Sequence, residues 1–171
     1  HARRALEMLS SGDAEIGIIR FRSEYCDYFE EQTAQRELSF QVLSRYKYRV
    51  LLPLDHPLAQ KKTLRMEDLD GYTEIVHGDN FRVRTKQEEA ERRKILTVDR
   101  LAQVSLLETI WGAYMWSQEQ PQRCLERWHL VQKTCENNPV TYHDALIYNP
   151  QYVVTDIEAG FIRHVLSQMQ R

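Results

Sequence analysis

Two short stretches carry side chains that could bind a small molecule, and each follows an apolar run that is expected to be a β-strand. One is Arg20 with Phe21, after residues 15–19, and the other is residues 77–80, after residues 72–76. In open α/β sheets, ligands bind just outside the carboxyl ends of strands. The planar guanidinium of Arg20 suits a carboxylate, although a solvated loop residue without a ligand is the alternative.

The sequence does not indicate an enzyme. It contains no G-x-S-x-G, no P-loop, no H-E-x-x-H and no G-x-G-x-x-G. The six histidines are scattered and none lies at zinc-ligand spacing from a second histidine or a cysteine. His56 is expected to make a local hydrogen bond at a turn. His77, at the carboxyl end of a predicted strand, is expected to contact a ligand rather than to act in catalysis. We therefore expect no catalytic residue, no metal ligand and no cofactor.

Composition limits the class of protein further. The chain has 171 residues, of which 42% are hydrophobic and 28% charged, as in an ordinary globular protein. A net charge of −2 gives no basic footprint for nucleic acid, and no apolar run is long enough to span a bilayer. Cys26, Cys124 and Cys135 match no zinc or redox spacing, which favours a reducing, cytoplasmic location; a redox-sensing pair of Cys124 and Cys135 is the alternative to inert thiols.

Hydrophobic periodicity predicts helices that alternate with strands, which favours an α/β fold with mostly parallel strand pairing. Asp99 is expected to cap one helix, whose broad apolar stripe predicts burial on more than one side. Thr155 and Glu158 form a capping box for the last helix. The predicted helices are residues 1–11, 64–69, 81–94, 100–110 and 155–169, and the predicted strands are residues 15–19, 40–43, 50–54, 72–76, 95–98, 112–116, 128–131 and 140–148.

Residues 50–79 are the most specific part of the sequence. An apolar strand ending in Pro53 is followed by His56-Pro57-Leu58-Ala59, a polar spacer, Leu64-x-x-Glu67-Asp68-Leu69 and a new strand, which reads as a β-α-β unit. This stretch resembles the effector-binding (regulatory) domain of LysR-type bacterial transcriptional regulators. The helix, turn and strand of residues 1–19, and Gly112 after the capped helix, are similar to elements of the same family.

The resemblance implies a type 2 periplasmic-binding-protein-like fold, with two α/β lobes joined by two crossovers. The first lobe would comprise residues 1–43 and 137–171, incomplete at its N-terminus, and the second lobe residues 44–136. Asn137 to Pro139 would be the return crossover. An effector with an anionic group at Arg20 would bind in the cleft between the lobes. The residues against it would be Arg20, Phe21, His77, Gly78, Asp79, Asn80, Phe81 and Trp111. Phe81 and Trp111 would be its apolar walls. The residues alone favour Trp116 as a core residue and Trp111 and Trp128 as partly exposed packing residues, rather than the three as a box that stacks on a ligand.

The resemblance also implies a function. Effector binding would act allosterically on a homodimer or homotetramer, and DNA would be bound only through an N-terminal helix-turn-helix domain that precedes the sequence given. The alternative is a solute-binding protein that delivers its ligand to a transporter and has the same fold.

Overall fold

The computed structural model describes residues 2–77 and 93–169. It divides into two compact units, which we call the first unit (His1–Tyr46 with Val140–Arg171) and the second unit (Lys47–Pro139). The chain therefore passes from one unit to the other twice. The lobe boundaries expected from the sequence, after residues 43 and 136, each lie three residues earlier than these divisions.

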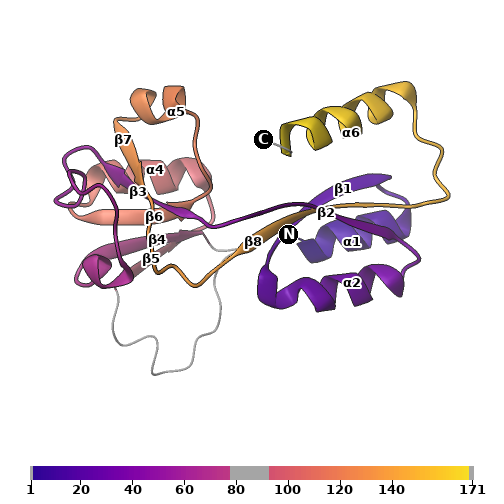
Figure 1. The fold of residues 1–171 in the computed structure, drawn as a ribbon, viewed down its shortest axis with the longest axis horizontal. Coiled ribbons are helices and arrows are strands. Elements are labelled where there is room, and N and C mark those ends of the chain that lie inside the picture. The colour runs from indigo at the N-terminus through magenta and orange to yellow at the C-terminus, as the bar shows by residue number, and fades with distance from the viewer. Residues whose placement is uncertain (1, 78–92, 170–171) are drawn as a thin grey trace. The chain divides into compact units, whose positions relative to one another are not determined.

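The first unit is built on a three-stranded antiparallel sheet in the order β1 (Ile16–Arg22), β8 (Tyr142–Tyr148), β2 (Ser39–Tyr46). The central strand, β8, is buried along its length up to Ile147. Helices α1 (Ala2–Ser11) and α2 (Cys26–Ala34), the latter preceded by the 3₁₀ turn η1 (Ser23–Tyr25), cover one face (Figure 1). The core between them and the sheet comprises Leu6, Leu9, Ile19, Phe21, Phe29, Leu38, Ala145 and Ile147.

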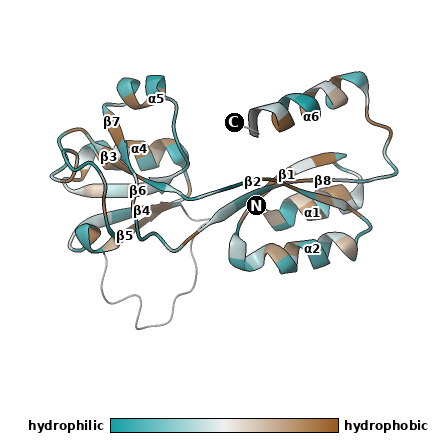
Figure 2. Ribbon diagram, viewed as in Figure 1, coloured by the Kyte–Doolittle hydropathy of each residue, from teal (hydrophilic) through white to brown (hydrophobic). Residues whose placement is uncertain are grey.

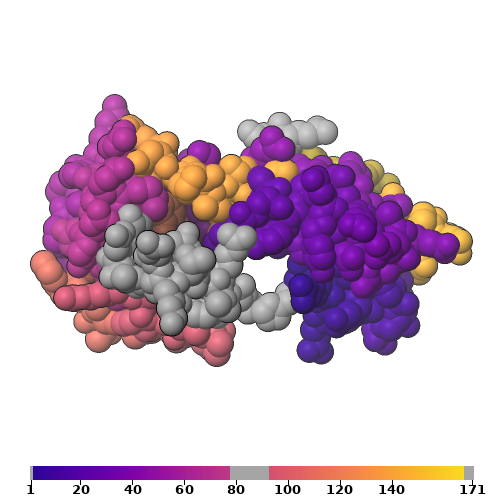
Figure 3. All heavy atoms as spheres, turned by 90° about the horizontal axis from the view of Figure 1, so that it is seen from below, coloured from indigo at the N-terminus to yellow at the C-terminus, as the bar shows by residue number. Residues whose placement is uncertain are grey.

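The surface of the first unit reflects this layering. Seen from below, it is formed mainly by the indigo and purple atoms of its N-terminal residues, which include α1 and α2 (Figure 3). Helix α6 (Asp156–Met169) lies on the other side of the sheet (Figure 1). The predicted capping box is confirmed, because the Thr155 N–H donates to Glu158 Oε2 at 2.7 Å and the Glu158 N–H donates to Thr155 Oγ1 at 3.3 Å.

The second unit contains a five-stranded sheet in the order β5 (Lys94–Thr97), β4 (Thr73–His77), β6 (Ala113–Ser117), β3 (Arg49–Pro53), β7 (Leu130–Lys133). Helix α4 (Arg100–Thr109) packs against one face, and its Asp99 cap accepts from the Ala102 N–H at 2.9 Å, as predicted. The 3₁₀ turn η2 (Met66–Leu69) places Leu69 in the core of the opposite face, with Val50, Leu52, Leu64 and Tyr114. Helix α5 (Gln122–Arg127) has no buried residue and is largely hydrophilic in colour (Figure 2).

Strand direction differs from the expectation. Among the described strands, two pairings are parallel, β4 with β5 and β4 with β6, and the other four pairings are antiparallel. The predicted β-α-β unit is wrong, because β6 lies between β3 and β4, antiparallel to β3 and parallel to β4. Periodicity identifies a strand but not its partner, and the partner here comes from residues 113–117.

The structure also differs from the expectations about helices. Helices α2 and α5 were not predicted, because their polar sequences carry little helical periodicity. Helix α4 is not buried on more than one side, since Leu101 is 67% exposed while Leu107 is buried. The helix predicted for residues 81–94 lies largely outside the described residues.

Candidate functional site

The central strand of the first unit contains two consecutive buried polar residues, His143 and Asp144. They are 2% and 5% exposed, respectively. Because successive side chains of a strand point to opposite faces, each side chain serves one face of the sheet. Both lie near the end at which β2 stops and β8 begins, where the chain passes to the second unit (Figure 1). Buried polar groups need hydrogen-bond partners, so each is the centre of a small cluster.

Asp144 holds the guanidinium of Arg20, its direct partner on β1. Arg20 Nε donates to Asp144 Oδ1 at 2.7 Å and Arg20 Nη2 donates to Oδ2 at 2.8 Å, which is a bidentate pair. The Tyr46 hydroxyl donates to Oδ1 at 3.0 Å, and the Arg20 guanidinium carbon lies 5.4 Å from the centre of the Tyr46 ring. An internal carboxylate thus occupies the fork that the sequence suggested for a ligand.

His143 serves the opposite face, where Arg45 Nε donates to its Nε2 at 2.9 Å. A guanidinium can only donate, so Nε2 must be unprotonated and the neutral ring carries its proton on Nδ1. Burial, and then the charge of Arg45, lower the pKa of His143. The Ser23 hydroxyl lies 3.0 Å from the same Nε2 and donates to the Thr141 carbonyl at 3.3 Å. Nδ1 is buried and has no hydrogen-bond partner among the described residues.

A β-bulge in β2 creates both clusters. The register with β8 shifts between Val42 and Ser44, so that Leu43 is an extra residue and Arg45 lies opposite His143. In an unshifted register Arg45 would lie opposite Tyr142, on the other face of the sheet. The bulge therefore directs Arg45 toward His143 and Tyr46 toward Asp144, and redirecting a side chain is a common role of bulges near binding sites.

The Ser23–His143 contact does not have the geometry of a catalytic pair. A histidine base must accept the serine proton while a carboxylate orients its other nitrogen. Here Nε2 already accepts from Arg45, Nδ1 meets no carboxylate among the described residues, and Asp144 pairs with Arg20 on the opposite face. The arrangement suits binding and orientation rather than proton transfer.

The remaining predicted site residues lie in different settings. Phe21 is 5% exposed, and its ring packs in the core with its centre 4.8 Å from that of Phe29. Trp111 is 79% exposed, just after α4, and His77 is 8% exposed at the carboxyl end of β4. Arg20 and Phe21 are neighbours on β1 but point to opposite faces. Gly78, Asp79, Asn80 and Phe81 lie outside the described residues.

The His56-Pro57-Leu58-Ala59 motif is structural. His56 is 4% exposed, and its Nδ1 accepts from the Leu58 N–H at 3.0 Å, as expected for a local hydrogen bond at a turn. Its ring centre lies 4.7 Å from that of Tyr72. Burial lowers the pKa of His56.

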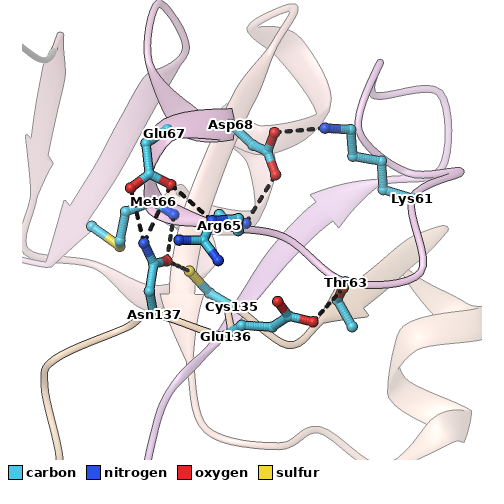
Figure 4. Close-up of polar contacts among 9 residues, drawn as sticks. All are labelled: Lys61, Thr63, Arg65, Met66, Glu67, Asp68, Cys135, Glu136 and Asn137. Carbon is cyan, nitrogen blue, oxygen red and sulfur yellow. Dashed lines mark hydrogen bonds and ion pairs between the residues drawn. The ribbon is translucent and has the colours of Figure 1, made fainter.

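A polar cluster fixes η2 to the segment that returns to the first unit (Figure 4). Asn137 Oδ1 accepts from the Met66 N–H at 2.8 Å, and Asn137 Nδ2 donates to Glu67 Oε1 at 2.9 Å. Lys61 Nζ donates to Asp68 at 2.6 Å, and this bond is the main cause of the lowered pKa of Asp68. These groups pair with one another, so we interpret the cluster as a structural link.

Sequence reasoning missed Ser23, Arg45, His143 and Asp144. One signal was present: residues 142–148 read as a buried strand, yet they contain two adjacent ionisable side chains. Such a pair at a central strand is costly to bury without partners, and partners on both neighbouring strands could have been sought. Within residues 2–77 and 93–169, no helix is both long and apolar enough to cross a membrane, and no group of three metal-ligating side chains is present.

Comparison with known proteins identifies the family. Residues 1–116 match the model of the LysR substrate binding domain. A probable nitrogen assimilation transcriptional activator of Synechocystis sp. is 25% identical over 115 residues, which are 67% of this chain and 35% of that protein. The chain thus spans about a third of the length of this curated relative.

Two solved structures show the same fold. The effector-binding domain of QuiR, in complex with shikimate, gives a TM-score of 0.65 at 13% identity and covers 98% of this chain and 78% of that one. The regulatory domain of Synechocystis CcmR, in complex with 2-PG, gives a TM-score of 0.64 at 14% identity and covers 100% and 81%. The present chain belongs to the LysR substrate binding domain family and has the periplasmic-binding-protein-like α/β fold of its effector-binding domains.

Proposed function

We propose that this chain is the effector-binding part of a LysR-type transcriptional regulator. The observation that carries the proposal is the family match over residues 1–116, which also favours a regulator over the solute-binding alternative and over an enzyme. Binding of an effector would stabilise one conformation of the protein and thereby change DNA binding, with a coupling free energy of about 1–3 kcal/mol. Such a regulator works in the cytoplasm as a homodimer or homotetramer and binds DNA through a separate helix-turn-helix domain.

The proposed effector is a small anionic molecule. The proposed binding residues remain Arg20, Phe21, His77, Gly78, Asp79, Asn80, Phe81 and Trp111, and to them we add Arg45 with its partner His143 in the first unit. Two observations support an anion: the guanidinium of the exposed Arg45 lies beside His143, and the structurally similar QuiR domain binds shikimate, which carries a carboxylate. Because Phe21 is buried, we assign it to the support of the site rather than to a wall.

A thermal-shift screen tests this function. Each anionic metabolite would be compared with an uncharged analogue at the same ionic strength, since a ligand that binds only the native state raises the melting temperature by mass action. We expect at least one anion to raise it in a saturable way. The Arg36→Gln variant, which removes a positive charge just after α2 from a side chain that donates to the Gln32 carbonyl, should leave this shift unchanged. A library in which no compound stabilises the protein would contradict the proposal.

A further inference from the structure

We propose that Arg45, held by His143, binds the anionic group of the effector, a carboxylate or a phosphate. This inference rests on the proposed effector-binding function and assigns its anion contact to Arg45 rather than to Arg20. It concerns the first unit alone, at the end of the sheet where β2 finishes.

The first step is the difference between the two arginines. Arg20 faces a buried carboxylate that takes both Nε and Nη2, so its charge is largely neutralised inside the protein. Arg45 is exposed, and the one hydrogen bond that its guanidinium makes among the described residues is from Nε to the neutral ring of His143. No carboxylate of the described residues lies within 4.0 Å of its guanidinium. The positive charge of Arg45 is therefore available to an external anion.

The second step is orientation. Arg45 Nε is hydrogen-bonded to His143, which is itself 2% exposed, so the plane of the guanidinium is fixed. The two terminal amino groups, which carry four of the five N–H donors of the guanidinium, remain available to an anion. An arginine held in this way loses less conformational entropy when it binds a planar or tetrahedral anion than a free side chain does. The β-bulge at Leu43 is the feature of the backbone that makes this orientation possible.

The third step concerns the surroundings. Burial, Glu30 and Asp27 raise the pKa of the Cys26 thiol, and the charge of Arg45 opposes them with a smaller effect, which indicates that Arg45 lies near the first turn of α2. The Ser23 hydroxyl lies beside the same histidine nitrogen as Arg45. The Ser23 proton is donated to the Thr141 carbonyl, so the donors for an oxyanion are the charged N–H groups of the Arg45 guanidinium.

The test is a titration of the chain with inorganic phosphate and, separately, with succinate, using sodium chloride of equal ionic strength as the reference. The Arg45 Nε–H resonance in ¹H–¹⁵N NMR spectra reports the site directly, and far-UV circular dichroism verifies that each variant is folded. We expect saturable shifts with one probe or both. Saturation by a single probe identifies the group as phosphate or carboxylate, and saturation by both identifies a general oxyanion site. Arg45→Gln should weaken binding by about tenfold or more, because a charged hydrogen bond is lost.

The variants separate binding from a structural role. Arg45→Lys keeps the charge without the fork and should bind with intermediate affinity, while His143→Gln keeps an acceptor for Arg45 Nε and should bind nearly as the unmodified protein does. Arg36→Gln should have no effect. Equal affinity in Arg45→Gln, no saturation by either probe, or loss of binding in Arg20→Gln alone would overturn the inference. If a metabolite stabilises the protein but Arg45→Gln leaves that shift unchanged, the inference fails while the proposed function stands.

Discussion

Replacing Arg20 with glutamine should destabilise the first unit more than replacing Asp144 with asparagine. The Asp144 side chain is 6% exposed, whereas that of Arg20 is 38% exposed. Removing one partner of a buried ion pair costs about 3–5 kcal/mol. Because water screens the partly exposed Arg20, we reduce this to about 2–3 kcal/mol for Arg20→Gln. Asp144→Asn should cost about 1–1.5 kcal/mol, since the released guanidinium is rehydrated and the amide oxygen can still accept one hydrogen bond.

The asymmetry can be measured by urea unfolding followed by far-UV circular dichroism. Trp111, Trp116 and Trp128 all lie in the second unit, so tryptophan fluorescence provides an internal control that should change little. The double variant Arg20→Gln/Asp144→Asn should be no less stable than Arg20→Gln alone, because no unpaired buried charge remains. An Asp144→Asn variant that loses more stability than Arg20→Gln, or effects that simply add, would refute this account of the pair.

Three further changes test other parts of the structure. Gly112→Ala should lower the free energy of unfolding by about 1–2 kcal/mol, and with it the melting temperature, because φ is +72° and the new Cβ would lie 3.0 Å from Tyr72 Cδ1. Gly160→Ala, whose Cβ meets nothing within 4 Å, should not lower the melting temperature. Asn137→Ala should cost about 1–2 kcal/mol in urea unfolding, because the Met66 N–H and Glu67 both lose a partner, while the exposed Thr63→Ala should cost less. The pKa values of His56 and His143 in the folded protein are lowered from 6.5, so the unfolded chain binds protons first and stability should fall as the pH drops below about 6.5. The double variant His56→Asn/His143→Gln should flatten this dependence of stability on pH between pH 7 and 5, and an unchanged slope would contradict the assignment.

Features that depend on neighbouring residues were predictable from the sequence. The Thr155–Glu158 box and the Asp99 cap each involve residues three positions apart, and both form as expected. Most strands were also found, since apolar runs identify them. The strand partners were not found, because parallel and antiparallel neighbours are chosen by packing across the whole sheet.

The candidate site was only partly predictable for the same physical reason. Arg20 was identified because it follows an apolar run, yet its partner Asp144 is 124 residues away, and nothing local shows that its charge is neutralised. Arg45 was not singled out, because its face of the sheet depends on a single extra residue in β2. A shift of one residue moves every side chain beyond it to the other face of the sheet. A sequence pattern that cannot locate the bulge therefore cannot say that Arg45 lies on the face opposite Asp144 and remains available to a ligand, while Arg20 pairs with that carboxylate.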